Sequence, residues 1–140
     1  MALRLETRSR ALALQLLYAW DEVGAGRPDP RAFFAAICAA RGSRPQVETK
    51  ALDLAEAVLR AQERYDVVLQ RAAENWRLER LAVVDRNVLR LAMAELEQGE
   101  APVRVVIDEA IRLARWFGSS RSPAFVNGIL DRVARDGDRL

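Results

Sequence analysis

Apolar residues recur every three to four positions along most of the chain, which is the spacing of one face of an α-helix. These stripes run through residues 8–20, 30–41, 46–74, 81–96, 102–117 and 122–133. No window shows sustained alternation of apolar and polar residues bounded by turn signals, the pattern of a half-buried strand. We therefore predict an all-α fold, a bundle of about six or seven helices around one core, with residues 1–140 as a single domain.

Capping residues predict where several helices begin and end. Asp29 followed by Pro30 predicts the start of a short helix, and Gly42 predicts its end. Ser43 to Gln46 fits a capping box, so we expect the next helix to begin there.

The sequence leaves the continuity of the first middle helix open but predicts the end and the burial of the second. The stretch from Gln46 to Glu74 contains neither glycine nor proline, so it is either one long helix or two with a bend near Arg64. Gly99 ends the following helix, residues 81–96. We expect that helix to be the most buried, because apolar residues also lie outside its main stripe.

The stretch 102–133 predicts two helices joined by a short basic elbow. Pro102 suits a first helical turn, Gly118 ends the helix, and Ser122 with Pro123 predicts the next start, the serine hydroxyl accepting a first-turn N–H. The residues in and just before the elbow are Arg112, Arg115, Ser119, Ser120 and Arg121. Hydroxyls, backbone donors and guanidinium groups beside a helix start suit a phosphate group.

A second basic helix start lies at the front of the chain. Arg4, Arg8 and Arg10 face a single acidic residue, Glu6, in the first turns of the first helix. Cations are unfavourable there because the helix dipole prefers anions. We therefore expect these arginines to be exposed and to meet an external anionic partner.

Net charge is only +2, but of the 22 basic residues Lys50 alone is lysine. Arginine binds phosphate bidentately and stacks on bases, which is compatible with nucleic-acid binding. A GC-rich genome or a warm habitat would enrich arginine equally, so the argument rests on where the arginines lie.

Other features bear on chemistry and location. The chain has no histidine, which removes the commonest general base and nitrogen ligand of zinc, and it has no phosphate-binding glycine motif. Cys38 lies among alanines, which favours a small buried residue over a reactive thiol. No apolar run approaches the ~20 residues that span a bilayer, and residues 1–10 lack the apolar middle of a signal peptide. We predict a cytoplasmic protein that is not an enzyme and holds no metal or cofactor.

Three segments carry a resemblance to a known family. VIDEAIRLARWFG followed by FVNGILD resembles the C-terminal signature of the NusB family of bacterial transcription antitermination factors. RSRALALQLLYAW, from Arg8, is similar to that family's basic first helix, and VDRNVLRLAMAEL, from Val84, to its central helix. The resemblance covers most of the chain and is weak between Val23 and Glu74.

The resemblance implies a function and two partners. It implies a small non-catalytic factor that binds single-stranded boxA RNA in nascent transcripts, most tightly together with NusE, a ribosomal small-subunit protein. The complex would act on the RNA polymerase elongation complex, notably on ribosomal RNA operons. The two basic helix starts would then lie side by side.

The matched motifs and the basic helix starts together give candidate site residues. We expect RNA contacts from Arg4, Arg8, Arg10, Gln15, Arg115, Ser119, Ser120, Arg121 and Asn127, and NusE contacts from Tyr18, Asp85 and Arg86. Structural roles compete with these: Tyr18 as core, Asp85 as a complement to the helix dipole, and Asn127 as a cap. We interpret Phe117, Phe125 and Val126 as packing residues and Gly128 as a close helix contact.

Two other functions stay open from the sequence. A NusB-like domain also occurs in ribosomal RNA cytosine methyltransferases, so the chain could be a detached RNA-gripping module for such an enzyme. It could also be a helical protein adaptor. The sequence does not decide whether the free protein forms a homodimer.

Overall fold

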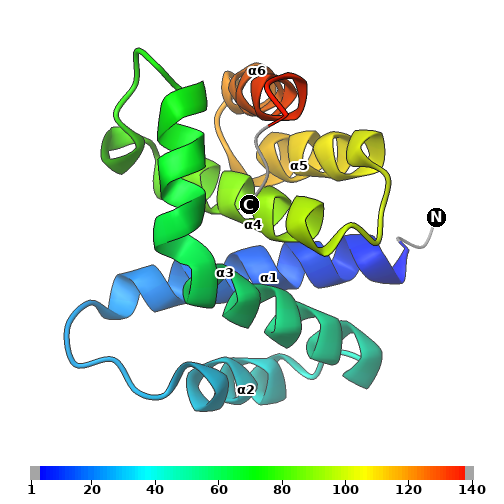
Figure 1. Cartoon of the computed structure of the whole chain (residues 1–140). Coiled ribbons are helices and arrows are strands. Elements are labelled where there is room, and N and C mark those ends of the chain that lie inside the picture. The colour runs from blue at the N-terminus through cyan, green and yellow to red at the C-terminus, as the bar shows by residue number, and fades with distance from the viewer. Residues whose placement is uncertain (1–3, 138–140) are drawn as a thin grey trace.

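The computed structural model describes residues 4–137 and consists of helices joined by short connections (Figure 1). In order, the elements are α1 (Leu5–Val23), α2 (Pro30–Arg41), α3 (Pro45–Ala72), the short 3-10 helix η1 (Leu78–Arg80), α4 (Val83–Gln98), α5 (Val103–Phe117) and α6 (Ser122–Arg135). The described range contains no strand, and the all-α prediction of six or seven helices is confirmed. None of its helices is both long and apolar enough to span a membrane. The first three residues of the basic N-terminal segment lie outside the described residues.

Helix α4 lies at the centre of the bundle. It packs against α1, α3, α5 and α6, and every residue from Asn87 to Ala94 is buried. From top to bottom in Figure 1, α6, α5, α4, α1 and α2 follow one another, and α3 crosses beside them. Leu89 and Ala92, which lie outside the main stripe of α4, are buried as predicted because helices cover it on several sides, whereas Val83 in its first turn is only half-buried.

Helix α3 is one continuous helix from Pro45 to Ala72, and its axis bends along its length (Figure 1). The predicted capping box at its start is wrong. Arg44 occupies the cap position, and no side chain accepts a first-turn N–H there, while Pro45 provides a first residue that needs no partner for its nitrogen.

The predicted bounds of α2 are confirmed. An Asp29 carboxylate oxygen accepts the Ala32 N–H at 3.0 Å, and Gly42 adopts a left-handed conformation with φ +68° at the other end. Cys38 on this helix is buried, and burial raises the pKa of its thiol. The interpretation of Cys38 as a small core residue is therefore confirmed.

Candidate nucleic-acid interface

The elbow between α5 and α6 has a fixed geometry. The Ser122 hydroxyl accepts the Ser119 N–H at 2.9 Å, and the Ser122 N–H donates to the Ser119 carbonyl at 3.1 Å. A Cβ atom on Gly118 would lie 2.5 Å from the Ser122 hydroxyl oxygen and 2.8 Å from the Ala114 carbonyl oxygen, so only glycine fits without rearrangement. The prediction that Ser122 caps α6 is wrong. Its buried hydroxyl is already bonded inside the elbow, and Arg121 occupies the cap position.

Most polar residues of the elbow are exposed, although the Ser119 hydroxyl also lies 3.2 Å from the buried Ser122 hydroxyl. Ser119, Ser120 and Arg121 are exposed, and so are Arg115 in the last turn of α5 and Asn127 on α6. Within residues 4–137, Arg115 and Arg121 form no ion pair. Their guanidinium groups are therefore free to bind an anion.

Asn127 and the residues around it divide between surface and core. The Asn127 side chain makes no hydrogen bond in the described part of the chain, so its interpretation as a helix cap gains no support. Val126 is fully buried, and Phe125 packs edge-on against Trp76 with 5.8 Å between ring centroids, so both are packing residues as interpreted. The interpretation of Gly128 as a close contact is wrong, because a Cβ atom there would meet open space.

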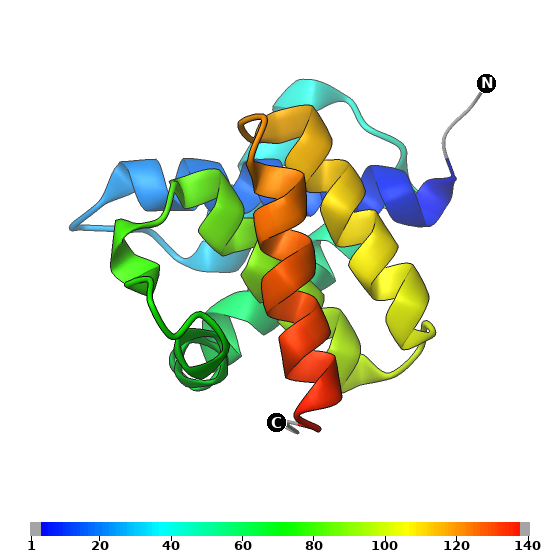
Figure 2. The same cartoon turned by 90° about the horizontal axis from the view of Figure 1, so that it is seen from above.

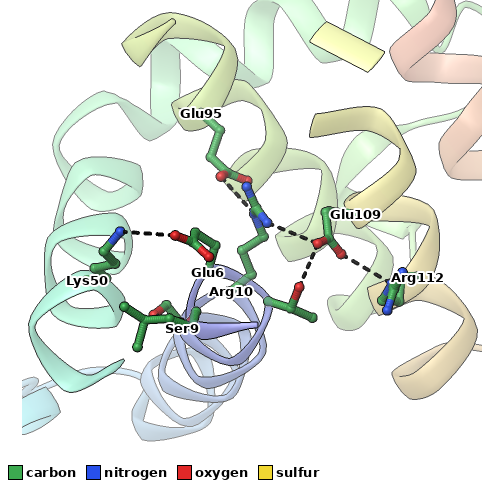
Figure 3. Close-up of polar contacts among 9 residues, drawn as sticks. Glu6, Ser9, Arg10, Lys50, Glu95, Glu109 and Arg112 are labelled. Carbon is green, nitrogen blue, oxygen red and sulfur yellow. Dashed lines mark hydrogen bonds and ion pairs between the residues drawn. The ribbon is translucent and has the colours of Figure 1, made fainter. Parts of the chain in front are cut away.

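The arginines at the start of α1 have two different environments. Arg4 is exposed and Arg8 is half-buried, and neither has an ion-pair partner among residues 4–137. The expectation that Arg10 is exposed is wrong, because only 6% of its surface is accessible. Its Nε atom lies 2.8 Å from a Glu95 oxygen, and its Nη1 atom lies 3.2 Å from Glu109 (Figure 3).

Arg10 therefore connects three helices. Glu95 comes from α4 and Glu109 from α5, and Glu109 also accepts the Thr7 hydroxyl at 2.6 Å and lies 3.3 Å from the Arg112 Nε atom (Figure 3). Burial raises the pKa of Glu95, and the positive charge of Arg10 opposes that rise. Arg10 is committed to this cluster and is not a free cation on the surface.

The two basic helix starts do not lie side by side. Glu109 contacts Thr7 and Arg10 near the start of α1, whereas Phe117 lies beside Tyr18, further along α1. At 1.5 Å per residue, Glu109 and Phe117 are about 12 Å apart along α5. Figure 2 shows α5 crossing α1 obliquely before it ends at the elbow. The basic groups thus form a band along α5, not one compact cluster.

A groove beside this band contains residues from four helices. It has a volume of about 470 Å³ and is lined by Leu14, Gln15, Tyr18, Arg41, Val84 and Phe117, and we call it the Tyr18 groove. Tyr18 is 45% exposed and Phe117 39% exposed. The alternatives that Tyr18 is a core residue and Phe117 a packing residue are therefore wrong. The groove places Gln15, expected to contact RNA, next to Tyr18, expected to contact a protein.

Asp85 and Arg86 lie in the first turn of α4, directly after a lining residue of the Tyr18 groove. Both are half-buried. One Asp85 carboxylate oxygen is buried without a hydrogen-bond partner, and so is the Arg86 Nε atom, although an Arg86 Nη1 group donates to the Glu79 carbonyl at 3.3 Å. Buried polar atoms without partners are costly, so the first turn of α4 is an energetically unfavourable part of the fold.

Sequence reasoning missed Arg41 and Val84 as groove residues. Arg41 is the last residue of α2, where a cation is explained fully by the helix dipole, and nothing local indicates that α2 ends beside α5. Among the described residues, no cluster of three or more acidic, histidine or cysteine side chains could hold a metal ion.

Comparison with known proteins agrees with the segment resemblance. The NusB family model matches residues 7–135. The transcription antitermination protein NusB of Anaeromyxobacter dehalogenans strain 2CP-1 is 47% identical over 132 residues, which cover 91% of this chain and 89% of that protein.

Two solved structures show the same fold. The chain is similar to NusB of T. maritima with a TM-score of 0.84 and 33% identity, covering 97% of this chain and 94% of that one. It is also similar, with a TM-score of 0.82 and 24% identity, to a chain in a crystal structure of the antitermination factors NusB and NusE in complex with dsRNA, covering 96% of this chain and 99% of that one.

Proposed function

This chain belongs to the NusB family, and from that premise we propose that it is a transcription antitermination protein that binds RNA together with NusE. The family is one of antitermination factors, and the role is non-enzymatic. We further propose that residues 1–140 act as one RNA-binding domain in the cytoplasm, on boxA sequences of ribosomal RNA operons, within the RNA polymerase elongation complex.

One observation carries the RNA part of the proposal. Arg115 and Arg121 are exposed and unpaired within residues 4–137, and the rigid elbow beside them exposes the two serines Ser119 and Ser120. Guanidinium groups bind phosphate bidentately, and serine hydroxyls add hydrogen bonds of the kind that position a phosphate backbone. Arg4, Arg8, Gln15 and Asn127 extend this surface, whereas buried Arg10 supports it from within.

The RNA in the similar NusB–NusE structure is double-stranded, whereas we propose a single-stranded target for this chain. Sequence-specific proteins generally read single-stranded RNA because the deep, narrow major groove of an RNA duplex hides its base edges. The Tyr18 groove, with an exposed aromatic ring on each of two helices, suits unpaired bases or the side chains of NusE.

For NusE we propose the surface around Tyr18, Asp85 and Arg86. Tyrosine combines a large apolar ring with one polar group, which is typical of residues that anchor interfaces. Asp85 contributes a half-buried carboxylate, which we propose pairs with a cation of this basic ribosomal protein.

The test is a titration of single-stranded boxA RNA, a scrambled RNA and a boxA duplex, each with and without NusE. We expect the tightest binding for single-stranded boxA with NusE present. Arg121→Glu should weaken RNA binding by about tenfold or more without lowering the melting temperature, because the exposed side chain has no structural partner. Arg60→Glu makes the same charge change at an exposed residue of α3 and should have a small effect.

Three results would contradict the proposal. Binding of NusE without any RNA binding would indicate a protein adaptor instead. A preference for structured ribosomal RNA, independent of both boxA and NusE, would favour a module of a methyltransferase system. Unfolding of Arg121→Glu would show that Arg121 has a structural role.

A further inference from the structure

An exposed tryptophan ends the outer face of α5. The buried face of this helix consists of Val106, Ile107, Ala110, Leu113 and Ala114. Trp116 lies outside that set and is 44% exposed, although an indole ring is among the largest apolar groups a protein can bury. The fold therefore leaves this ring at the surface without using it in the core.

A guanidinium group holds the ring in place. The Arg112 Cζ atom lies 5.7 Å from the centroid of Trp116, within the range of a cation–π contact. Arg112 is itself fixed by Glu109, whose oxygen lies 3.3 Å from the Arg112 Nε atom, and Glu109 is anchored by Thr7 and Arg10 (Figure 3). Arg112 thus connects the polar cluster around Glu109 with an aromatic side chain on the surface.

The charges around Trp116 are cationic. Arg115 and Arg121, which precede and follow the ring in sequence, have no ion-pair partner within the described range. The carboxylate of Glu109 is neutralised by Arg10 and Arg112. An exposed aromatic ring in contact with one arginine and close in sequence to two unpaired arginines matches the way proteins bind single strands, with phosphates on arginines and a base stacked on the ring.

We propose that Trp116, held by Arg112, is a stacking platform for one unpaired base of the bound RNA. This inference rests on the proposed function and adds a contact outside the Tyr18 groove and the serine elbow. A base on the indole ring would place its neighbouring phosphates near Arg115 and Arg121, so the RNA path would extend along the outer face of α5.

The experiment combines protein and RNA variants. Trp116→Ala, Trp116→Phe and wild type are titrated, with NusE present, against boxA-type single-stranded RNAs that each lack one base at successive positions. For wild type, one position should be sensitive to base removal. Trp116→Ala should bind the intact RNA about 5- to 150-fold more weakly, since one stacked base contributes roughly 1–3 kcal/mol, and should lose the sensitivity at that position. Trp116→Phe keeps a stacking ring and should retain most of the affinity.

The control is Val67→Ala, which shortens an apolar side chain that is 59% exposed on α3 and belongs to neither proposed binding surface. It should leave both the affinity and the sensitive position unchanged. If wild type binds RNA but Trp116→Ala binds equally well, or keeps every base sensitivity, the stacking inference is overturned and the proposed function stands. If Trp116→Ala loses NusE affinity with RNA absent, Trp116 is a protein contact. Failure of wild type to bind any of the RNAs overturns the proposed function as well.

Discussion

The environment of an arginine in this chain indicates whether it stabilises the fold or is available to bind a ligand. Arg10 and Arg90 are each 6% exposed and bonded to carboxylates from other helices, so they hold the bundle together. Arg8, Arg115 and Arg121 have no such partner within the described residues. Only these unpaired arginines can bind a phosphate without leaving a buried carboxylate unpaired.

We expect Arg10→Ala to reduce the free energy of unfolding by about 3 kcal/mol or more, because removing one partner of a buried ion pair leaves the other uncompensated. Here the uncompensated groups are Glu95 and Glu109, whose side chains are each 13% exposed. Urea denaturation at neutral pH measures the loss. A loss below about 1 kcal/mol would show that water reaches and solvates these carboxylates.

The same variant should depend on pH in a defined direction. Burial raises the pKa of Glu95 above 4.5, so the folded state takes up a proton more readily than the unfolded state, and folding is favoured as pH falls through the carboxyl range. Without Arg10 the pKa should rise further. The destabilisation relative to wild type should therefore be largest near pH 7 and shrink toward pH 4.5. A difference that is constant across this range would exclude Glu95 as its source.

Arg10 also shows why its buried position could not be predicted from the sequence. Its spacing from Arg4 and Arg8 predicts three similar cations on the first turns, and local signals carry no trace of two glutamates 85 and 99 residues further along. The prediction for Phe117 was wrong in the opposite sense, because a residue expected to pack is exposed. An apolar residue at helical spacing suggests packing, and only the assembled bundle shows that α5 ends beside a groove.

At the level of elements, two glycines near the C-terminus have opposite surroundings. Gly118 ends α5, where a Cβ atom would collide with Ser122 and with the Ala114 carbonyl. Gly128 lies inside α6, where a Cβ atom would meet nothing within 4 Å. The two positions make a matched pair of substitutions.

Gly118→Ala should destabilise the protein by about 1–3 kcal/mol, because the elbow has no room for the methyl group. Gly128→Ala should stabilise it by roughly 0.5–1 kcal/mol, since alanine loses less backbone entropy in a helix. Denaturation midpoints for the two variants measure both effects. Equal effects of the same sign would show that the elbow rearranges freely and is not a fixed site.

Local signals predicted the helices well and their caps less well. Periodicity is a property of each segment, so the helices and the end of α5 at Gly118 followed from the sequence. Ser43 and Ser122 both looked like caps, but the helix start moved to Pro45 in one case and the hydroxyl bonded backward to Ser119 in the other. Several residues can satisfy the same first turn, and packing selects among them.

At the scale of the whole molecule, α1 connects the two proposed binding surfaces. Arg4 and Arg8 at its start belong to the proposed RNA surface, and Tyr18 further along it lines the groove proposed for NusE. A partner in that groove would touch helices that also carry RNA contacts. This arrangement suits a protein whose RNA affinity increases when NusE is bound, by a coupling free energy that must act equally in both directions.

Charge reversal at Asp85 tests the NusE side of this arrangement. Asp85 is half-buried in the first turn of α4, and one of its carboxylate oxygens is buried without a hydrogen-bond partner among the described residues. If it meets a cation of NusE across a desolvated contact, Asp85→Lys should weaken NusE binding by about 2 kcal/mol or more, measured by calorimetric titration. Asp108→Lys changes the net charge equally at a residue whose side chain is 58% exposed on α5, and it should keep wild-type affinity.

Since coupling is reciprocal, Asp85→Lys should also reduce the gain in RNA affinity that NusE provides, while RNA binding without NusE stays unchanged. Wild-type NusE affinity in folded Asp85→Lys protein would remove Asp85 from the interface.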